Sequence, residues 1–193
     1  MTMTEPLPDG SMIRKLWVNE TDAYRDHLLC LDRDSRYRRF SGTVTDDFIA
    51  RHAATASGLG VVVHGFFLDG VLRGAAELRR LGSIFKQEGE AAFSVEQPWQ
   101  SRGVGTVLLE RTLLSARNRG IKLLQMHCLT ENRRMQQLAR KFAAELSFDF
   151  GGVIGEVDPP RSTALSLMRE MMADNSDLAN AIFEKQSRLL RLA

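Results

Sequence analysis

The sequence contains few cysteines and no long apolar run. Two of its 193 residues are cysteines, Cys30 and Cys128, and both lie within apolar patterns. This predicts two buried free thiols rather than a disulfide framework. No apolar stretch approaches the roughly 20 residues of a membrane span, and the first residues lack the basic and apolar regions of a signal peptide. We therefore expect a cytoplasmic protein with no membrane partner.

The net charge and the histidine spacing argue against a nucleic-acid-binding protein and against a metal site. The net charge of +2 is too small to suggest a nucleic-acid partner. The four histidines have no paired metal-ligand spacing, so no metal site is expected. A 193-residue chain with 44% hydrophobic residues fits one domain with a sizeable core.

A glycine-containing segment, Gln100 to Thr106, joins a strand-like run at 91–96 to an amphipathic helical pattern at 104–119. The Gly-x-Gly spacing and the helix start would leave backbone N–H groups free for an anion. A dinucleotide fingerprint would need glycine at position 108, which is leucine, and a P-loop would need lysine after Gly103. An ordinary strand-to-helix connection remains the alternative.

The rest of the pattern predicts a strand, two helices, three antiparallel strands, a helix, a strand, a helix and a strand. The Asp69-Gly70 pair favours a hairpin between strands at 60–68 and 71–81, and a third strand is expected at 90–96. A buried strand is expected at 121–129, a long helix at 131–146 and one extended region at 148–157.

Three segments resemble the GNAT superfamily of acyl-CoA-dependent N-acyltransferases. Gln100-x-x-Gly103-x-Gly105 is similar to its coenzyme A loop, and the segment from Asn132 to Lys141 is similar to its fourth-helix motif. The run from Asp34 to Phe40 resembles bacterial protein-lysine acetyltransferase domains. The resemblance implies a GNAT domain at 12–158, an α/β (α+β) fold with a mixed, mostly antiparallel sheet of about six to seven strands flanked by helices. Residues 159–193 would form a C-terminal helical extension.

The same resemblance implies an N-acetyltransferase that moves an acetyl group from acetyl-CoA to a primary amine by direct attack in a ternary complex. The acceptor, a small amine or a protein lysine, stays open. A second reading is a non-catalytic module that binds CoA species. The residues expected at the cofactor are Val95, Gln100, Ser101, Arg102, Gly103, Val104, Gly105, Thr106 and Asn132.

The acid–base groups are less well marked. Glu90 lies one residue from the position where relatives carry a strand glutamate that acts as base, and Glu96, Glu77 and His127 are alternatives. The tyrosine that relatives use as general acid is replaced by Ala139. Thiolate protonation would need another donor or solvent.

One basic segment and one apolar segment can each be interpreted in two ways. Arg33, Arg36, Arg38 and Arg39 form either a solvated helix face or a surface that recognises an acidic acceptor or closes over the cofactor. Apolar residues between Leu165 and Leu190 predict two helices that dock on the domain or on a second subunit, as in a homodimer.

Overall fold

A single seven-stranded sheet organises the chain in the computed structural model, which describes residues 7–82, 86–149 and 152–174. The strands are β1 (Ser11–Lys15), β2 (Val61–Leu68), β3 (Val71–Arg80), β4 (Glu88–Val95), β5 (Leu123–Leu129), β6 (Glu145–Asp149) and β7 (Gly152–Val157). The helices are α1 (Thr21–Cys30), α2 (Arg33–Phe40), α3 (Asp46–Ala54), α4 (Val104–Asn118) and α5 (Arg133–Lys141), with short 3₁₀ turns η1 (Thr55–Ser57) and η2 (Gln97–Trp99). No helix among these described residues is long and apolar enough to cross a membrane.

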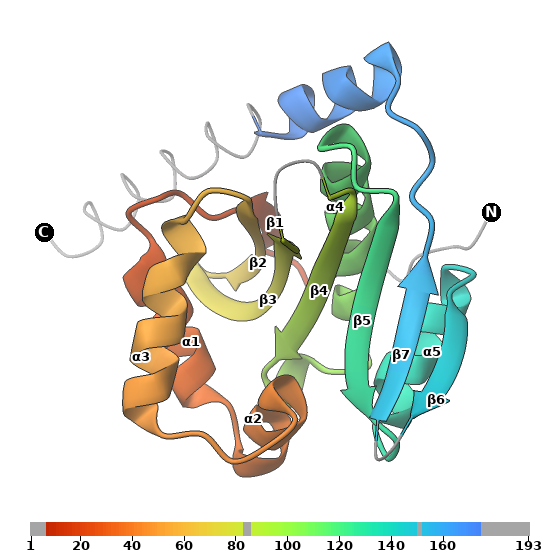
Figure 1. The fold of residues 1–193 in the computed structure, drawn as a ribbon. Coiled ribbons are helices and arrows are strands. Elements are labelled where there is room, and N and C mark those ends of the chain that lie inside the picture. The colour runs from red at the N-terminus through yellow and green to blue at the C-terminus, as the bar shows by residue number, and fades with distance from the viewer. Residues whose placement is uncertain (1–6, 83–85, 150–151, 175–193) are drawn as a thin grey trace, which may run out of the picture.

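The strand order is β1-β2-β3-β4-β5-β7-β6, and only the central β4–β5 pair is parallel. That pairing spans Glu88 to Glu90 of β4 and then stops. In Figure 1 the two strands run side by side at their upper ends and separate towards their arrowheads, with α2 below the gap. The expected mixed, mostly antiparallel sheet flanked by helices is confirmed.

The sequence prediction is wrong at the end of α5. The helix expected at 131–146 stops at Lys141, and Ala143 has a left-handed φ of 57° that ends the helical path. The single extended region expected at 148–157 is a hairpin of β6 and β7, with β7 inserted beside β5. Leu146 faces Gly155 of β7 across this hairpin, so packing on the sheet overrides the local helical pattern. Cys30 is exposed rather than buried, whereas Cys128 is buried as expected.

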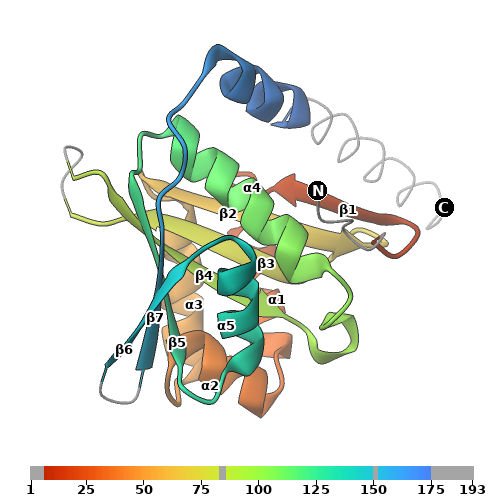
Figure 2. The ribbon, with the colours of Figure 1, turned by 90° about the vertical axis from the view of Figure 1, so that its right-hand side faces the viewer.

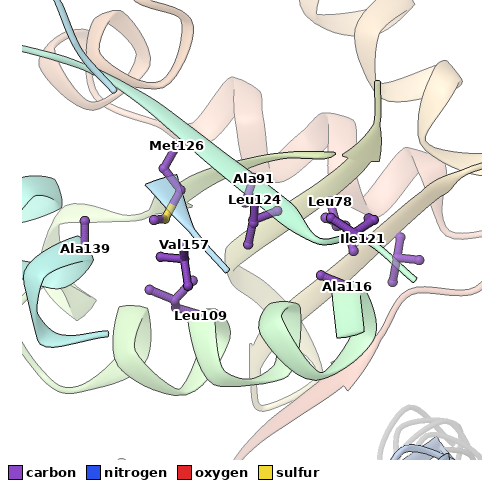
Figure 3. Close-up of a cluster of buried hydrophobic side chains, with 10 residues drawn as sticks. Leu78, Ala91, Leu109, Ala116, Ile121, Leu124, Met126, Ala139 and Val157 are labelled. Carbon is purple, nitrogen blue, oxygen red and sulfur yellow. The ribbon is translucent and has the colours of Figure 1, made fainter. Parts of the chain in front are cut away.

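Helices cover both faces of the central strands. Figure 2 shows α4 and α5 on one face, with α1 and α3 on the other. On the first face, Leu109 and Ala116 of α4 pack with Leu124 and Met126 of β5 (Figure 3). The second face buries Tyr24 and Leu28 of α1 against α3, β2 and β3. Because strand residues alternate between faces, every second residue of β4 points towards α1 and α2.

The C-terminal segment lies against the far end of α4 through polar contacts. A helix at 164–174 places Glu170 within hydrogen-bond distance of Ser115, Asn118 and Arg119 of α4. Its exposed apolar side chains are Leu165, Leu167, Met168, Met171 and Met172. The second helix expected in this extension lies outside the described residues.

A buried histidine couples β2 to this junction and makes stability depend on pH. His64 Nε2 lies 2.9 Å from Ser115 Oγ, whose hydroxyl donates to the Glu170 carboxylate at 2.8 Å. Ser115 therefore accepts from His64 Nε2–H, and neutral His64 satisfies the pair. Burial, together with the nearby cations Arg111 and Arg119, lowers the pKa of His64 to about 3.

This depressed pKa predicts a loss of stability below neutral pH. As pH falls below about 6.5, the unfolded chain protonates this histidine while the folded protein does not, so the free energy of unfolding decreases. Between about pH 7.5 and 5, urea titrations should show wild type losing about 2 kcal/mol more than His64→Gln. Equal losses in the two proteins would contradict this account. The pKa values of Glu77 and Glu170 are also lowered. These two carboxylates reduce the free energy of unfolding at lower pH, as the pH falls below their usual pKa of 4.5.

Candidate active site

A cleft of about 430 Å³ opens where β4 and β5 separate. It is bordered by the last residues of β4, the loop before α4, one side of α2 and one side of α5. Its lining comprises Ser35, Arg38, Arg39, Phe93, Ser94, Val95, Trp99, Gln100, Ser101, Gly103, Gly105, Thr106, Asn132, Arg134, Met135, Gln137, Leu138 and Lys141.

The edge of β4 offers backbone groups to the cleft. Glu96 N–H donates to the Arg73 carbonyl of β3, so the peptide groups of Phe93 and Val95 point the other way, into the splay. The Val95 carbonyl accepts from the side chain of Gln100 at 2.8 Å. The Val95 N–H and the N–H and carbonyl of Phe93 are therefore available, among the described residues, to pair with an amide-containing ligand that lies along the strand edge.

The loop before α4 exposes the start of the helix. Gly103 is the N-cap, has a φ of 76° and supplies no side chain to cap the helix. Its carbonyl accepts from the N–H groups of Thr106 and Val107. The backbone N–H groups of Val104 and Gly105 have no acceptor in the described part of the chain. An anion can therefore accept from both groups, and the positive end of the helix dipole adds to its binding.

The charge of the cleft fits an anionic ligand. Arg38, Arg39, Arg134 and Lys141 line it, whereas its lining includes no carboxylate from the described residues. Lys141 Nζ donates to Thr106 Oγ1 at 3.3 Å, which holds an ammonium group beside the helix start. Arg134 donates to the Gln100 amide, which ties α5 to the loop. A phosphate-bearing ligand with an amide arm suits these groups.

Seven of the nine residues expected at the cofactor line this cleft: Val95, Gln100, Ser101, Gly103, Gly105, Thr106 and Asn132. Asn132 also caps α5 by accepting from Met135 N–H at 3.2 Å. Arg102 and Val104 are not in the lining. The Arg102 guanidinium lies 5.4 Å from the centre of the Trp99 ring, and Val104 is buried in the core.

Two of the alternative bases are already engaged in ion pairs. Glu77 is bound by Arg39 at 2.7 Å and Arg79 at 2.5 Å, accepts from the Tyr24 hydroxyl and lies 2.8 Å from His52 Nε2. Burial alone would raise the pKa of Glu77, but the His52 hydrogen bond and the Arg39 charge hold it well below its usual range. Glu96 pairs with Arg73 at 3.0 Å and lies beside His27. Both carboxylates are occupied in holding the fold.

The other two candidates differ in position. His127 is exposed on β5 and does not line the cleft. Glu90 is half-buried on β4, outside the cleft lining, and its carboxylate forms no hydrogen bond or ion pair with the residues described. It lies near enough to Arg39 for its charge to raise the pKa of that guanidinium. Among the four candidates, Glu90 is thus the carboxylate with unused hydrogen-bonding capacity within the described residues, on the face of β4 that points towards α1 and α2.

Sequence reasoning missed two buried polar clusters on the α1 side of the sheet. One joins Glu77 to Tyr24, Arg39 and His52, and the other joins Ser94 to His27 and Glu96. Arg39, for which a solvated helix face was one of the two interpretations, lines the cleft and has a side chain that is only 7% exposed. The alternation of Ser94 and Glu96 along β4 was a visible signal, but their helix partners lie more than 60 residues away in sequence.

A glycine substitution tests whether the loop holds the cofactor. Gly103→Ala should weaken acetyl-CoA binding about tenfold or more, because a side chain at a φ of 76° strains the turn that presents the N–H groups. Gly120→Ala is the matched control, since Gly120 has a φ of 68°, an open side-chain position and a place at the other end of α4. Calorimetric titration should separate the two variants. Equal affinities would place the cofactor elsewhere.

Comparisons with known proteins agree with this geometry. Residues 22–144 match the Acetyltransferase (GNAT) family. Acetyltransferase Pat of Mycolicibacterium smegmatis is 27% identical over 99 residues, which are 51% of this chain and 30% of that protein. The match therefore spans under a third of the relative's length.

Solved structures share the fold at lower identity. The GNAT domain of S. lividans PAT superposes with a TM-score of 0.68 at 23% identity, covering 77% of this chain and 90% of that one. YncA of Salmonella typhimurium, solved with its cofactor acetyl-CoA, gives a TM-score of 0.59 at 20% identity, covering 81% and 98% of the two chains. From the family match over most of its length, the splayed β4 and β5 and the glycine loop at α4, we conclude that this chain belongs to the GNAT acetyltransferase family.

Proposed function

We propose that the protein is an N-acetyltransferase that transfers acetyl from acetyl-CoA to a primary amine in a ternary complex. The observation that carries the proposal is the cleft itself, which combines an open strand edge and an uncapped helix start with a lining that, among the described residues, has four cations and no carboxylate. Acetyl-CoA carries phosphates at one end and amides along its arm, so each group has a chemical counterpart here.

In this proposal the glycine loop binds the pyrophosphate through the N–H groups of Val104 and Gly105. The pantetheine arm pairs with the peptide groups of Phe93 and Val95. A backbone N–H of β4 then donates to the thioester carbonyl and stabilises the oxyanion that forms on attack. Arg134 and Lys141 contribute positive charge near the phosphates.

The acceptor approaches from the side of α2, where Ser35, Arg38 and Arg39 border the cleft. A primary amine is largely protonated at neutral pH and must lose a proton before it can attack. We assign this first deprotonation to Glu90, acting through water because Glu90 lies outside the cleft lining. The acceptor in this proposal is a small amine or a protein lysine.

Binding and turnover test the proposal separately. Titration with acetyl-CoA, CoA and NADH should show tight binding for the two CoA compounds alone. Thiol release should then require an amine from a panel of small amines and N-blocked lysine peptides. Binding without transfer would favour the non-catalytic CoA-binding module, and no binding of either CoA compound would exclude both readings.

The homodimer, the domain division and the cytoplasmic location stay predictions. A homodimer through the C-terminal segment is supported by the apolar side chains that the helix at 164–174 exposes while its polar Ser166 and Glu170 face α4. The division into a domain at 12–158 and an extension at 159–193 is a prediction of the same kind. So is the cytoplasmic location.

A further inference from the structure

A serine, a histidine and a glutamate form a chain beneath the cleft. Ser94 Oγ on β4 lies 2.9 Å from His27 Nε2 on α1, and His27 Nδ1 lies 3.4 Å from Glu96 Oε1. All three residues are buried, and the His27 side chain is fully enclosed. No step assigned above uses this chain.

The contacts show which group donates and which accepts along this hydrogen-bonded chain of three side chains. A carboxylate only accepts, so Glu96 orients His27 with its proton on Nδ1. His27 Nε2 is then an acceptor and takes a hydrogen bond from the Ser94 hydroxyl. The Arg73 guanidinium, 3.0 Å from Glu96 Oε2, holds the carboxylate in place. This is the order of groups that lets a hydroxyl exchange protons with an imidazole whose charge is stabilised by a carboxylate.

Ser94 lies at the splay between β4 and β5. It lines the cleft and stands between Phe93 and Val95, whose peptide groups open into the splay. Its side chain points to the α1 side, the same side as Glu90 four residues earlier. On α5, the position at which related enzymes carry a tyrosine acid is Ala139, which is buried in the core.

We propose that Ser94, His27 and Glu96 form a proton relay that carries the second proton of the amine to the CoA sulfur. The inference rests on the proposed function and deepens it. After the amine nitrogen bonds to the carbonyl carbon, its proton passes to Ser94 Oγ while the Ser94 proton passes to His27 Nε2. When the carbon–sulfur bond breaks, the imidazolium returns its proton through Ser94 to the thiolate. The products are the amide and CoASH, and the relay is restored.

The relay complements Glu90 without duplicating it. An alkylammonium must release two protons, one before attack and one as the amide forms. Glu90 takes the first and passes it to solvent. The relay moves the second from nitrogen to sulfur, which supplies the acid that the chain lacks at Ala139.

Single-site variants test the relay on the full chain with acetyl-CoA and the lysine peptide or amine that gives turnover. Ser94→Ala should lower kcat about 10- to 100-fold, with the acetyl-CoA dissociation constant within about twofold of wild type. The control is Ser115→Ala, because Ser115 contacts His64 and Glu170 at 2.9 and 2.8 Å on the far part of α4. It should change the melting temperature at most and leave kcat unchanged.

A double variant distinguishes a relay from two separate structural roles. If Ser94 and His27 act in one chain, Ser94→Ala with His27→Gln should be no slower than the slower single variant. Multiplying effects would overturn the proposal, as would a Ser94→Ala enzyme with wild-type kcat. An acetyl adduct on Ser94 in the intact mass spectrum would overturn it in favour of a nucleophilic serine. A wild-type protein that binds acetyl-CoA but transfers nothing would overturn both the relay and the proposed function, whereas normal transfer by Ser94→Ala overturns the relay alone.

Discussion

Glu77→Ala is expected to lower the free energy of unfolding by about 3 to 5 kcal/mol. The variant removes the carboxylate that binds Arg39 and Arg79 and accepts from Tyr24. The side chain of Arg39 is only 7% exposed, so its guanidinium would stay buried without a counter-charge. The Arg39 Nε is already buried without a hydrogen-bond partner among the described residues, so further unpaired N–H groups on this guanidinium would add to an existing cost.

Urea unfolding measures this loss, and the chain offers a matched control. Glu88 on β4 is also a strand carboxylate with a cationic partner, Lys86 at 2.7 Å, but both side chains reach solvent. Glu88→Ala should therefore cost about 1 kcal/mol or less. Replacing Arg39 by methionine in the Glu77→Ala background should restore part of the stability. A Glu77→Ala loss as small as that of Glu88→Ala would show that the cluster does not hold α2 on the sheet.

Glu90→Gln is expected to lower kcat about 100- to 10,000-fold while acetyl-CoA affinity stays near wild type. Glu90 is the base candidate whose carboxylate is free of hydrogen bonds and ion pairs among the described residues, and it lies outside the cleft lining. The loss should shrink as pH rises towards the pKa of the amine, about 10.4 for lysine, because free amine then becomes abundant without a base.

Initial rates of thiol release from about pH 7 to 10 measure this recovery. Glu88→Gln is the control, because Glu88 lies two residues earlier on the same face of β4 and is paired with Lys86. It should retain the wild-type rate across the range. Full activity of Glu90→Gln at neutral pH would remove Glu90 from the mechanism and leave deprotonation of the ammonium to solvent.

Most of the residues that the sequence predicted at the cofactor lie together in one cleft because they are local in the chain. Gly103 and Gly105 lie within one turn, and the strand, loop and helix that present them are consecutive in the chain. Backbone groups do most of the expected binding, so spacing and glycine content carry the information. Arg102 and Val104 show the limit, since the same local pattern cannot tell which loop side chains face the cleft.

The surroundings of the candidate acid–base groups were not readable from the sequence, because their partners are distant in the chain. Glu77 appeared to be a candidate base, yet α1, α2 and α3 surround it with Tyr24, Arg39 and His52. Likewise, the spacing of Ser94 and Glu96 is visible in the sequence, but their shared partner His27 is supplied by α1, more than 60 residues away. Such pairings depend on how helices pack over β3 and β4, which local propensity does not encode.

The sequence by itself determined the order of most elements, the glycine loop and the family resemblance, because hydrophobic periodicity and turn residues act over short distances. Tertiary structure decided where α5 ends, because Leu146 gains more by packing in the β6–β7 hairpin than by continuing a helix. It also decided which carboxylates pair with cations and which remain free. Those outcomes follow from burial, since a charge removed from water must find a partner wherever the folded chain supplies one.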